Sequence, residues 1–147
     1  MISFENVKKM WEKDSIINSL DLDHESLRIP NVLMRYLDIL SEYKMTLAKT
    51  KHDFSRLYAK KFLFLTGKMT DEEALQLGWV YDGNKILRQD IDKYLPGDED
   101  IIKAKSKIEY YEIVISHVEE IIKSINKREW EIRNAIEWRK FTNGSAI

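Results

Sequence analysis

The sequence contains no cysteine, and its 147 residues include only two prolines and five glycines. Without cysteine, the chain can form neither a disulfide framework nor a thiolate metal site. Charged residues make up 33% and hydrophobic residues 44% of the chain, a balance that favours helix and argues against disorder. A chain of this length is expected to form one domain with a real core.

Long apolar runs are also missing. No run approaches the roughly 20 residues that a membrane span needs. The first residues, MISFENVKKMWEKD, lack the unbroken apolar core of a signal peptide. We therefore expect a soluble, intracellular protein with no membrane partner.

Motifs of enzyme chemistry are incomplete. The TGK at 66–68 suggests a phosphate loop, but a Walker A motif needs glycine where Phe62 stands and Ser or Thr where Met69 stands. The segment 21–32 opens like a calcium loop but ends on Val32 instead of a glutamate. The histidines, none of which has metal-ligand spacing, are His24, His52 and His117. We expect no catalytic residue, no metal, no cofactor and no enzymatic activity.

Helix signals divide the chain into four parts. Ser3 is a candidate N-cap for a short amphipathic helix over 3–13, within an N-terminal segment over 1–30 that Pro30 closes. Asn31 can cap a long helix, giving a second part over 31–66 that Gly67 ends. A connector over 67–97 and a second long helix over 98–141 complete the chain.

The connector and the second long helix have their own signals. Thr70 and Glu73 form a capping box for a short helix through Leu77, which Gly78 ends. The string WVYDGNKIL leaves the option of a small β-hairpin, and a helical turn is expected over 87–94. Asp98 and the two acids after it match the positive N-terminus of the second long helix. The predicted fold class is therefore all-α, with two long helices and short connecting helices.

The most informative stretch is 44–68, where positive charge is concentrated in a chain of net charge -1. It contains a single acid, Asp53, and seven basic residues, which are Lys44, Lys49, Lys51, Arg56, Lys60, Lys61 and Lys68. Phe54, Tyr58, Phe62 and Phe64 are interleaved with the charges. Cations that track phosphates beside rings that stack on bases are typical of single-stranded nucleic-acid binding. A solvated helix face over a buried aromatic stripe is an equally good interpretation of the composition.

An acidic block follows directly, because residues 69–100 carry nine acidic and three basic groups. Such a surface could repel DNA from a second route or bind a basic partner. An ordinary solvated loop explains it as well.

An isoleucine-rich seam runs along the second long helix and indicates a homo-oligomer. Isoleucine at both core lines of a heptad disfavours a two-stranded coil. Part of the seam could pack on the first long helix, but one chain has few means to cover so wide a stripe. The expected oligomer interface consists of Ile108, Tyr111, Ile115, Val118, Ile122, Ile125, Ile132 and Ile136.

Three blocks of the sequence resemble the UvsY recombination mediators of T-even-like phages. They are MWEKDSIINSLDLDHESLRIP at 10–30, YAKKFLFLTGK at 58–68 and LRQDIDKYLPGDEDIIKAKSKIEYYEIVISHVEEIIKSINKREWEIRNAIEWRKFTNG at 87–144. The third is the most specific, through its IEYYE and IRNAIEWRKF strings. The variable part lies at about 69–86.

The resemblance implies a non-enzymatic accessory factor of homologous recombination and repair. Such proteins bind single-stranded DNA coated by a single-strand-binding protein, weaken that coat and load a RecA-like recombinase. They assemble into a ring-like homo-oligomer through their C-terminal helices. The expected location is the cytoplasm of the infected bacterial host.

The resemblance also implies a DNA-contacting motif at the end of the first long helix. Lys61 matches a basic position and Lys60 lies beside it, while Phe64 and Leu65 fall where the family usually has two tyrosines. Leu65 cannot stack as a ring does, so the phosphate role carries over and the stacking role rests on Phe64. The expected nucleic-acid-binding residues are Lys49, Lys51, Arg56, Lys60, Lys61, Phe64 and Lys68.

Two other function classes stay open. A structural helical assembly protein without DNA affinity would have its basic block neutralised by the acidic segment over 69–100. A phage nuclease would need a metal-binding carboxylate cluster, which the sequence does not show.

Overall fold

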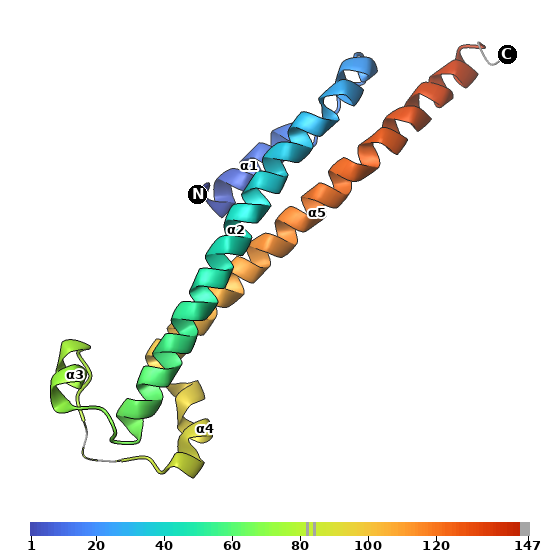
Figure 1. Ribbon diagram of the computed structural model, residues 1–147. Coiled ribbons are helices and arrows are strands. Elements are labelled where there is room, and N and C mark those ends of the chain that lie inside the picture. Colours follow the sequence, from blue (N-terminus) through green and yellow to red (C-terminus); the bar gives the residue numbers. More distant parts are fainter. Residues whose placement is uncertain (82, 84, 145–147) are drawn as a thin grey trace. The chain divides into compact units, whose positions relative to one another are not determined.

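The computed structural model describes residues 1–81, 83 and 85–144, and these residues form helices and connecting loops without a strand (Figure 1). In chain order the elements are α1 (Phe4–Asp14), α2 (Leu22–Leu65), α3 (Asp71–Gln76), the 3-10 turn η1 (Arg88–Asp90), α4 (Ile91–Tyr94), the 3-10 turn η2 (Leu95–Gly97) and α5 (Glu99–Thr142). The predicted all-α class, with two long helices and short connecting ones, is confirmed.

Side-chain caps set several of these boundaries where the sequence predicts them. Ser3 Oγ accepts a hydrogen bond from Asn6 N at 3.2 Å and so caps α1. Thr70 Oγ1 accepts from Glu73 N at 3.3 Å at the start of α3. Asp98 Oδ1 accepts two backbone N–H groups of the first turn of α5, at 3.1 and 3.2 Å. Each bond satisfies an N–H group that has no partner inside its helix.

The start of α2 differs from the prediction. The helix begins at Leu22 instead of after Asn31, and Pro30 lies inside it. A proline removes one helical hydrogen bond, and the prediction treated it as a boundary. Packing outweighs that loss, because Leu22 and Glu25 in the first turn are buried. Glu25 also accepts a 3.0 Å bond from Arg28, which supports the turns before the proline.

The described residues of the optional hairpin form no strand. Residues 79–81 and 85–87 are described and are not in a strand, while Asp82 of the expected turn lies outside the described residues. The backbone N–H of Ile86 donates to Leu65 O at 3.0 Å instead of to a neighbouring strand. The segment therefore closes on the end of α2.

The described chain forms two compact units, and α2 and α5 each contribute residues to both. The first unit comprises Met1–Met45 and the chain from Glu112 onward. Its buried apolar side chains are Val7, Leu22, Val32, Tyr36, Ile39, Tyr43, Val114, Ile115, Val118, Ile121, Ile125 and Ile132.

Polar contacts hold α1 within this first unit. Tyr43 donates from its hydroxyl to Ile2 O at 2.7 Å. Tyr36 donates to the Asp14 carboxylate at 3.0 Å, and burial, helped by this bond, raises the pKa of the Tyr36 hydroxyl. Arg128, which is buried, donates to the main-chain oxygen of Asp14. The two bonds to Asp14 tie the end of α1 to α2 and α5, and the bond to Ile2 ties the residues before α1 to α2.

The second unit, Thr46–Tyr111, has two apolar clusters. One packs Phe64, Met69 and Ala74 with Trp79 and Tyr81, and so attaches α3 to the end of α2. The other consists of Ile91, Leu95, Ile101, Phe54, Leu57, Phe62, Leu65 and Ile86. Leu65 belongs to both clusters and joins them.

No helix in the described part of the chain combines the length and the apolar character that crossing a membrane requires.

Candidate nucleic-acid interface

Three exposed cations lie along one line of α2 in the second unit. Lys49, Arg56 and Lys60 are separated by seven and four residues, which are close to whole helical turns. Asp53 lies near the same line and pairs with Arg56 at 3.7 Å. Lys49 and Lys60 form no ion pair with a described carboxylate. We call Lys49, Arg56 and Lys60 the basic row.

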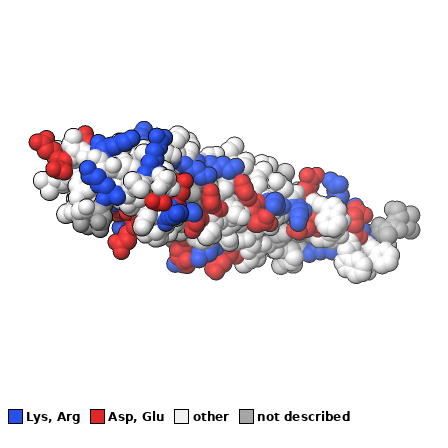
Figure 2. All heavy atoms as spheres, turned by 90° about the horizontal axis from the view of Figure 1, so that it is seen from below, with Lys and Arg blue, Asp and Glu red and all other residues white. Residues whose placement is uncertain are grey.

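The other predicted cations are placed differently. Lys51 is exposed but lies about 200° around the helix from Lys49, so it faces away from the basic row. Lys44 lies in the first unit and pairs with Glu119 at 3.3 Å. Lys68 is exposed just after α2, beyond the turn that ends the helix. Seen from below, the molecular surface carries basic side chains in groups, with acidic ones among them (Figure 2).

Gly67 makes the turn between α2 and Lys68. Its φ of 73° lies in the left-handed region, where a side chain is strained. A Cβ at this position would also lie 2.8 Å from the Lys85 stem. The turn therefore requires glycine, and the Lys85 stem lies against it.

Lys61 is not part of the exposed surface, because only 6% of it is accessible. Its Nζ lies 2.9 Å from Asp100 Oδ2 and 3.1 Å from Asp98 Oδ2. It also lies 4.3 Å from the centre of the Trp79 ring, whose indole N–H donates to Asp100 at 3.2 Å. A buried cation needs such partners, since an unpaired one would lose its hydration without compensation.

The electrostatics of this cluster favour its charged form. The hydrogen bond from Lys61 is the main cause that holds the pKa of the Asp100 carboxyl below its ordinary value. Attraction to Lys61, the Trp79 bond and the charge of Lys103 act in the same direction. The carboxylate therefore stays ionised and keeps Lys61 in place.

Phe64 is likewise taken up by internal packing. It is 8% accessible and stacks on Tyr81 with ring centres 4.5 Å apart. Its contact with Trp79 is tilted, at 5.4 Å. The predicted stacking residue thus forms the core of the α3 cluster in this structure.

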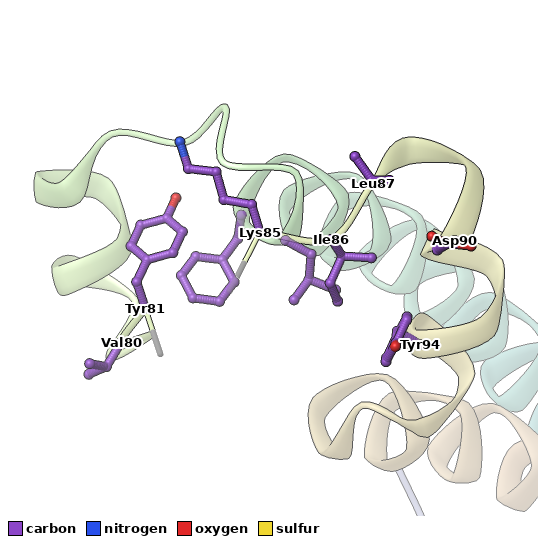
Figure 3. Close-up of a pocket in the computed structure, with 9 residues that line it drawn as sticks. Val80, Tyr81, Lys85, Ile86, Leu87, Asp90 and Tyr94 are labelled. Carbon is purple, nitrogen blue, oxygen red and sulfur yellow. The ribbon is translucent and has the colours of Figure 1, made fainter. Parts of the chain in front are cut away.

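An open cavity of about 530 Å³ adjoins this cluster. Tyr81 and Lys85 lie on one side of it, and Asp90 and Tyr94 lie on the other (Figure 3). The aliphatic side chains of Leu65, Val80, Ile86 and Leu87 form most of the remaining lining. Its single cation and single acid make it a weaker anion site than the basic row.

The isoleucine seam is divided between the interior and the surface. Four of its eight residues, Ile115, Val118, Ile125 and Ile132, are buried within the single chain. Ile108, Tyr111 and Ile122 are half-buried, and Ile136 is 37% accessible. Much of the seam thus forms the core of the chain itself, which leaves less of it for a second copy.

Sequence reasoning missed the partners of Lys61. Asp98 and Asp100 were interpreted only as acids at a helix N-terminus, and Trp79 only as part of a hairpin. The available signal was a lysine next to the apolar positions Phe62 and Phe64, which indicates a cation on a buried face. In the described residues, no group of three or more His, Asp or Glu side chains is arranged to hold a metal ion.

The fold and the site define a class of protein: an all-helical chain that presents cations along a long helix. The chain belongs to the UvsY family, since the family model described as recombination, repair and ssDNA binding protein UvsY matches residues 10–145. Its role therefore lies in recombination, repair and binding of single-stranded DNA. No curated protein sequence matches the chain.

Solved structures show the same fold. Three crystal structures of the recombination mediator protein UvsY of bacteriophage T4 superpose with TM-scores of 0.79, 0.80 and 0.82, for lattice types IV, I and II. The matches cover 93–97% of this chain and 98–99% of the T4 chains, at 15–16% sequence identity. At this identity the comparison establishes the fold, and the site must be argued from the residues of this chain.

Proposed function

We propose that this protein is a non-enzymatic recombination mediator. It binds single-stranded DNA, helps to displace a single-strand-binding protein and loads a RecA-like recombinase. Membership of the UvsY family supports the general role, and the T4 protein of the same fold is a recombination mediator. The observation that carries the DNA-binding part is the exposed basic row of Lys49, Arg56 and Lys60 on α2.

In this proposal the cations contact the phosphates of the strand, and the protein has little preference for base sequence. Lys49, Arg56 and Lys60 form the central contacts, with Lys68 beyond the helix end, while Lys51, on the opposite face of α2, is a peripheral contact at most. Lys61 has a different role from the one that the resemblance implies: it positions the end of α2 through Asp98 and Asp100. Phe64 supports the same region from within its apolar cluster.

One basic row offers few phosphate contacts, so a single chain is expected to bind weakly. A homo-oligomer repeats the row, and linked sites raise the overall affinity without any new contact. A strand that follows several copies is bent along them, which would weaken the hold of a coat protein.

The surface that we propose for self-association lies on the solvent side of α5. Trp130 and Phe141 are three turns apart on one line, with Trp138 a turn before Phe141, and they are 65–68% accessible. Large exposed apolar side chains of this kind mark interaction surfaces. Ile122 and Ile136 of the seam are also partly exposed, but they lie about 80–120° around α5 from Trp130 and are not part of this surface.

A salt titration tests the DNA-binding part. Binding of a fluorescent single-stranded oligonucleotide is measured over a series of salt concentrations, with the mass of the protein in solution determined in parallel. We expect steep salt dependence and little sequence preference. Lys60→Ala should reduce the slope by about 0.7 per bound subunit, since each phosphate contact on a single strand releases about 0.7 of a counterion. An intact oligomer that fails to bind at low salt would indicate a structural assembly protein instead.

A further inference from the structure

A second group of cations lies near the basic row in the second unit, on a different helix. Lys103 and Lys107 are exposed in the first turns of α5 and are four residues apart, so they share one face. They belong to no sequence motif, and they lie outside the basic stretch over 44–68.

Two shallow hollows connect these cations with the basic row. The first, of about 250 Å³, is lined by Arg56 and Lys60 of α2 on one side and by Leu77 and Trp79 on the other. The second, of about 440 Å³, is lined by Lys103 and Lys107 of α5 and again by Leu77 and Trp79. Leu57 lines both as well. The shared residues thus form an apolar platform with two cations on either side.

The charge around the platform is positive. The acids that line the hollows, Asp53 and Asp100, are each engaged with another cation: Asp53 pairs with Arg56 at 3.7 Å and Asp100 with Lys61 at 2.9 Å. Lys103 also acts on the Asp100 carboxylate, which leaves Lys60 on one side and Lys107 on the other without a described carboxylate partner. An anionic ligand would meet uncompensated cations on both sides of the platform.

The platform itself offers a ring. Trp79 is half-buried and is held on one side by Lys61, at 4.3 Å from its centre, and by Phe64. Its indole N–H is fixed by Asp100. The ring is therefore anchored before any ligand arrives, and a base that stacks on it need not order it.

We infer that Trp79 and Leu77, flanked by Arg56 and Lys60 of α2 and Lys103 and Lys107 of α5, form a nucleotide-binding platform for single-stranded DNA. The bases lie on the apolar platform, and the phosphates on either side are neutralised by the two helices. This assignment rests on the proposed function and extends it to Trp79 and to α5. An apolar side chain of a protein partner would also fit the hollows, but it would leave the four surrounding cations unused.

The first experiment compares single lysine variants within one helix. Lys103→Ala and Lys107→Ala are each expected to lower affinity for single-stranded DNA severalfold and to reduce the salt slope by about 0.7 per bound subunit. Lys105→Ala is the matched control, because Lys105 is exposed on the same turn but lines neither hollow. It should leave both quantities close to those of the parent.

The second experiment compares an ordinary oligonucleotide with an abasic one of the same length and charge. Stacking on Trp79 should make the parent bind the ordinary strand at least about fivefold more tightly. Trp79→Leu should remove that preference, and Leu77→Ser, at a 41% accessible position, provides a second variant if Trp79→Leu fails to fold. Urea titration and helix content verify folding of each variant.

The outcomes separate the two proposals. If the parent binds neither strand at low salt, the proposed function fails and this inference fails with it. A second outcome is that the parent binds and Lys60→Ala lowers the salt slope, while Lys103→Ala and Lys107→Ala behave like Lys105→Ala. The proposed function then stands, and Lys103 and Lys107 do not contact DNA. Equal affinity for both strands would overturn the platform and favour a protein side chain as the occupant of the hollows.

Discussion

The ammonium group of Lys61 lies 2.9 Å from the carboxylate of Asp100 in an environment that leaves the lysine almost inaccessible. This contact joins the last turns of α2 to the first turn of α5 within the second unit. Lys60, the next residue in the chain, is exposed on the basic row. Two adjacent lysines therefore differ: Lys61 is held in the interior by its ion pairs, whereas Lys60 is exposed, and we propose that it contacts DNA.

Substitution of Lys61 should lower stability, whereas substitution of Lys60 should weaken DNA binding. Lys61→Met leaves Asp98 and Asp100 without their shared cation and should lower the free energy of unfolding by about 1–3 kcal/mol. Lys60→Ala should change it by less than about 0.5 kcal/mol and should weaken DNA binding instead. Urea titration of both variants checks this. Equal stability of Lys61→Met and the parent would show that the buried ion pair contributes nothing.

The Lys61–Asp100 contact should also make stability depend on pH. The pKa of Asp100 is lower in the folded protein than in the unfolded chain, so its contribution is complete above the unfolded value of about 3.9. It is lost as pH falls through the lower folded value. Asp100→Asn should thus be less stable than the parent at pH 7, and the difference should shrink below about pH 4. A difference that stays constant from pH 7 to pH 2.5 would contradict the assignment.

In the first unit, the Tyr43 hydroxyl should contribute to stability without affecting DNA binding. Tyr43→Phe removes a buried 2.7 Å bond to Ile2 O and leaves that oxygen without this donor. We expect a loss of about 1 kcal/mol in the free energy of unfolding. Tyr94→Phe is the control, because Tyr94 is 58% accessible. Similar losses in the two variants would mean that the bond to Ile2 has no net value.

Self-association should respond to the exposed face of α5 and folding to its buried face. Trp138→Lys should lower the mass of the assembly while helix content stays unchanged, because this side chain is 66% accessible. Ser124→Lys adds the same charge at another exposed position of α5 and should leave the mass unchanged. Sedimentation measures all three proteins. Assembly by Trp138→Lys at the parent mass would exclude this face as the interface.

Ile125→Lys is the complementary variant, because Ile125 is fully buried in the single chain. A charge there should unfold the first unit and not merely separate subunits. Circular dichroism distinguishes these effects. A folded monomer would restore the original interpretation of the seam as a contact between copies.

Local chemistry allowed much of the fold to be predicted. Ser3, Thr70 and Asp98 cap their helices with bonds that span three residues or fewer, so the cap and its partner are adjacent in the sequence. The absence of glycine and proline between 32 and 66 predicted an unbroken helix there. The positive charge of 44–68 identified the basic row, because Lys49, Arg56 and Lys60 follow the helical repeat.

Features that depend on distant residues were predicted poorly. Pro30 was interpreted as a boundary because its local cost is visible in the sequence, whereas the packing of Leu22 that offsets it is not. The seam could not be divided between interior and interface, since Ile125 and Ile136 look alike as residue types. For the same reason, the buried Lys61 could not be distinguished from the exposed Lys60.

The sequence alone determined the caps, the location of the positive charge and the helices apart from the start of α2, since each depends on residues within a few positions of one another. The tertiary structure decided which cations are available to a ligand and which isoleucines are available to a second copy. It decided both because burial and ion pairing depend on residues brought together from distant positions, as Lys61 is with Trp79 and Asp100.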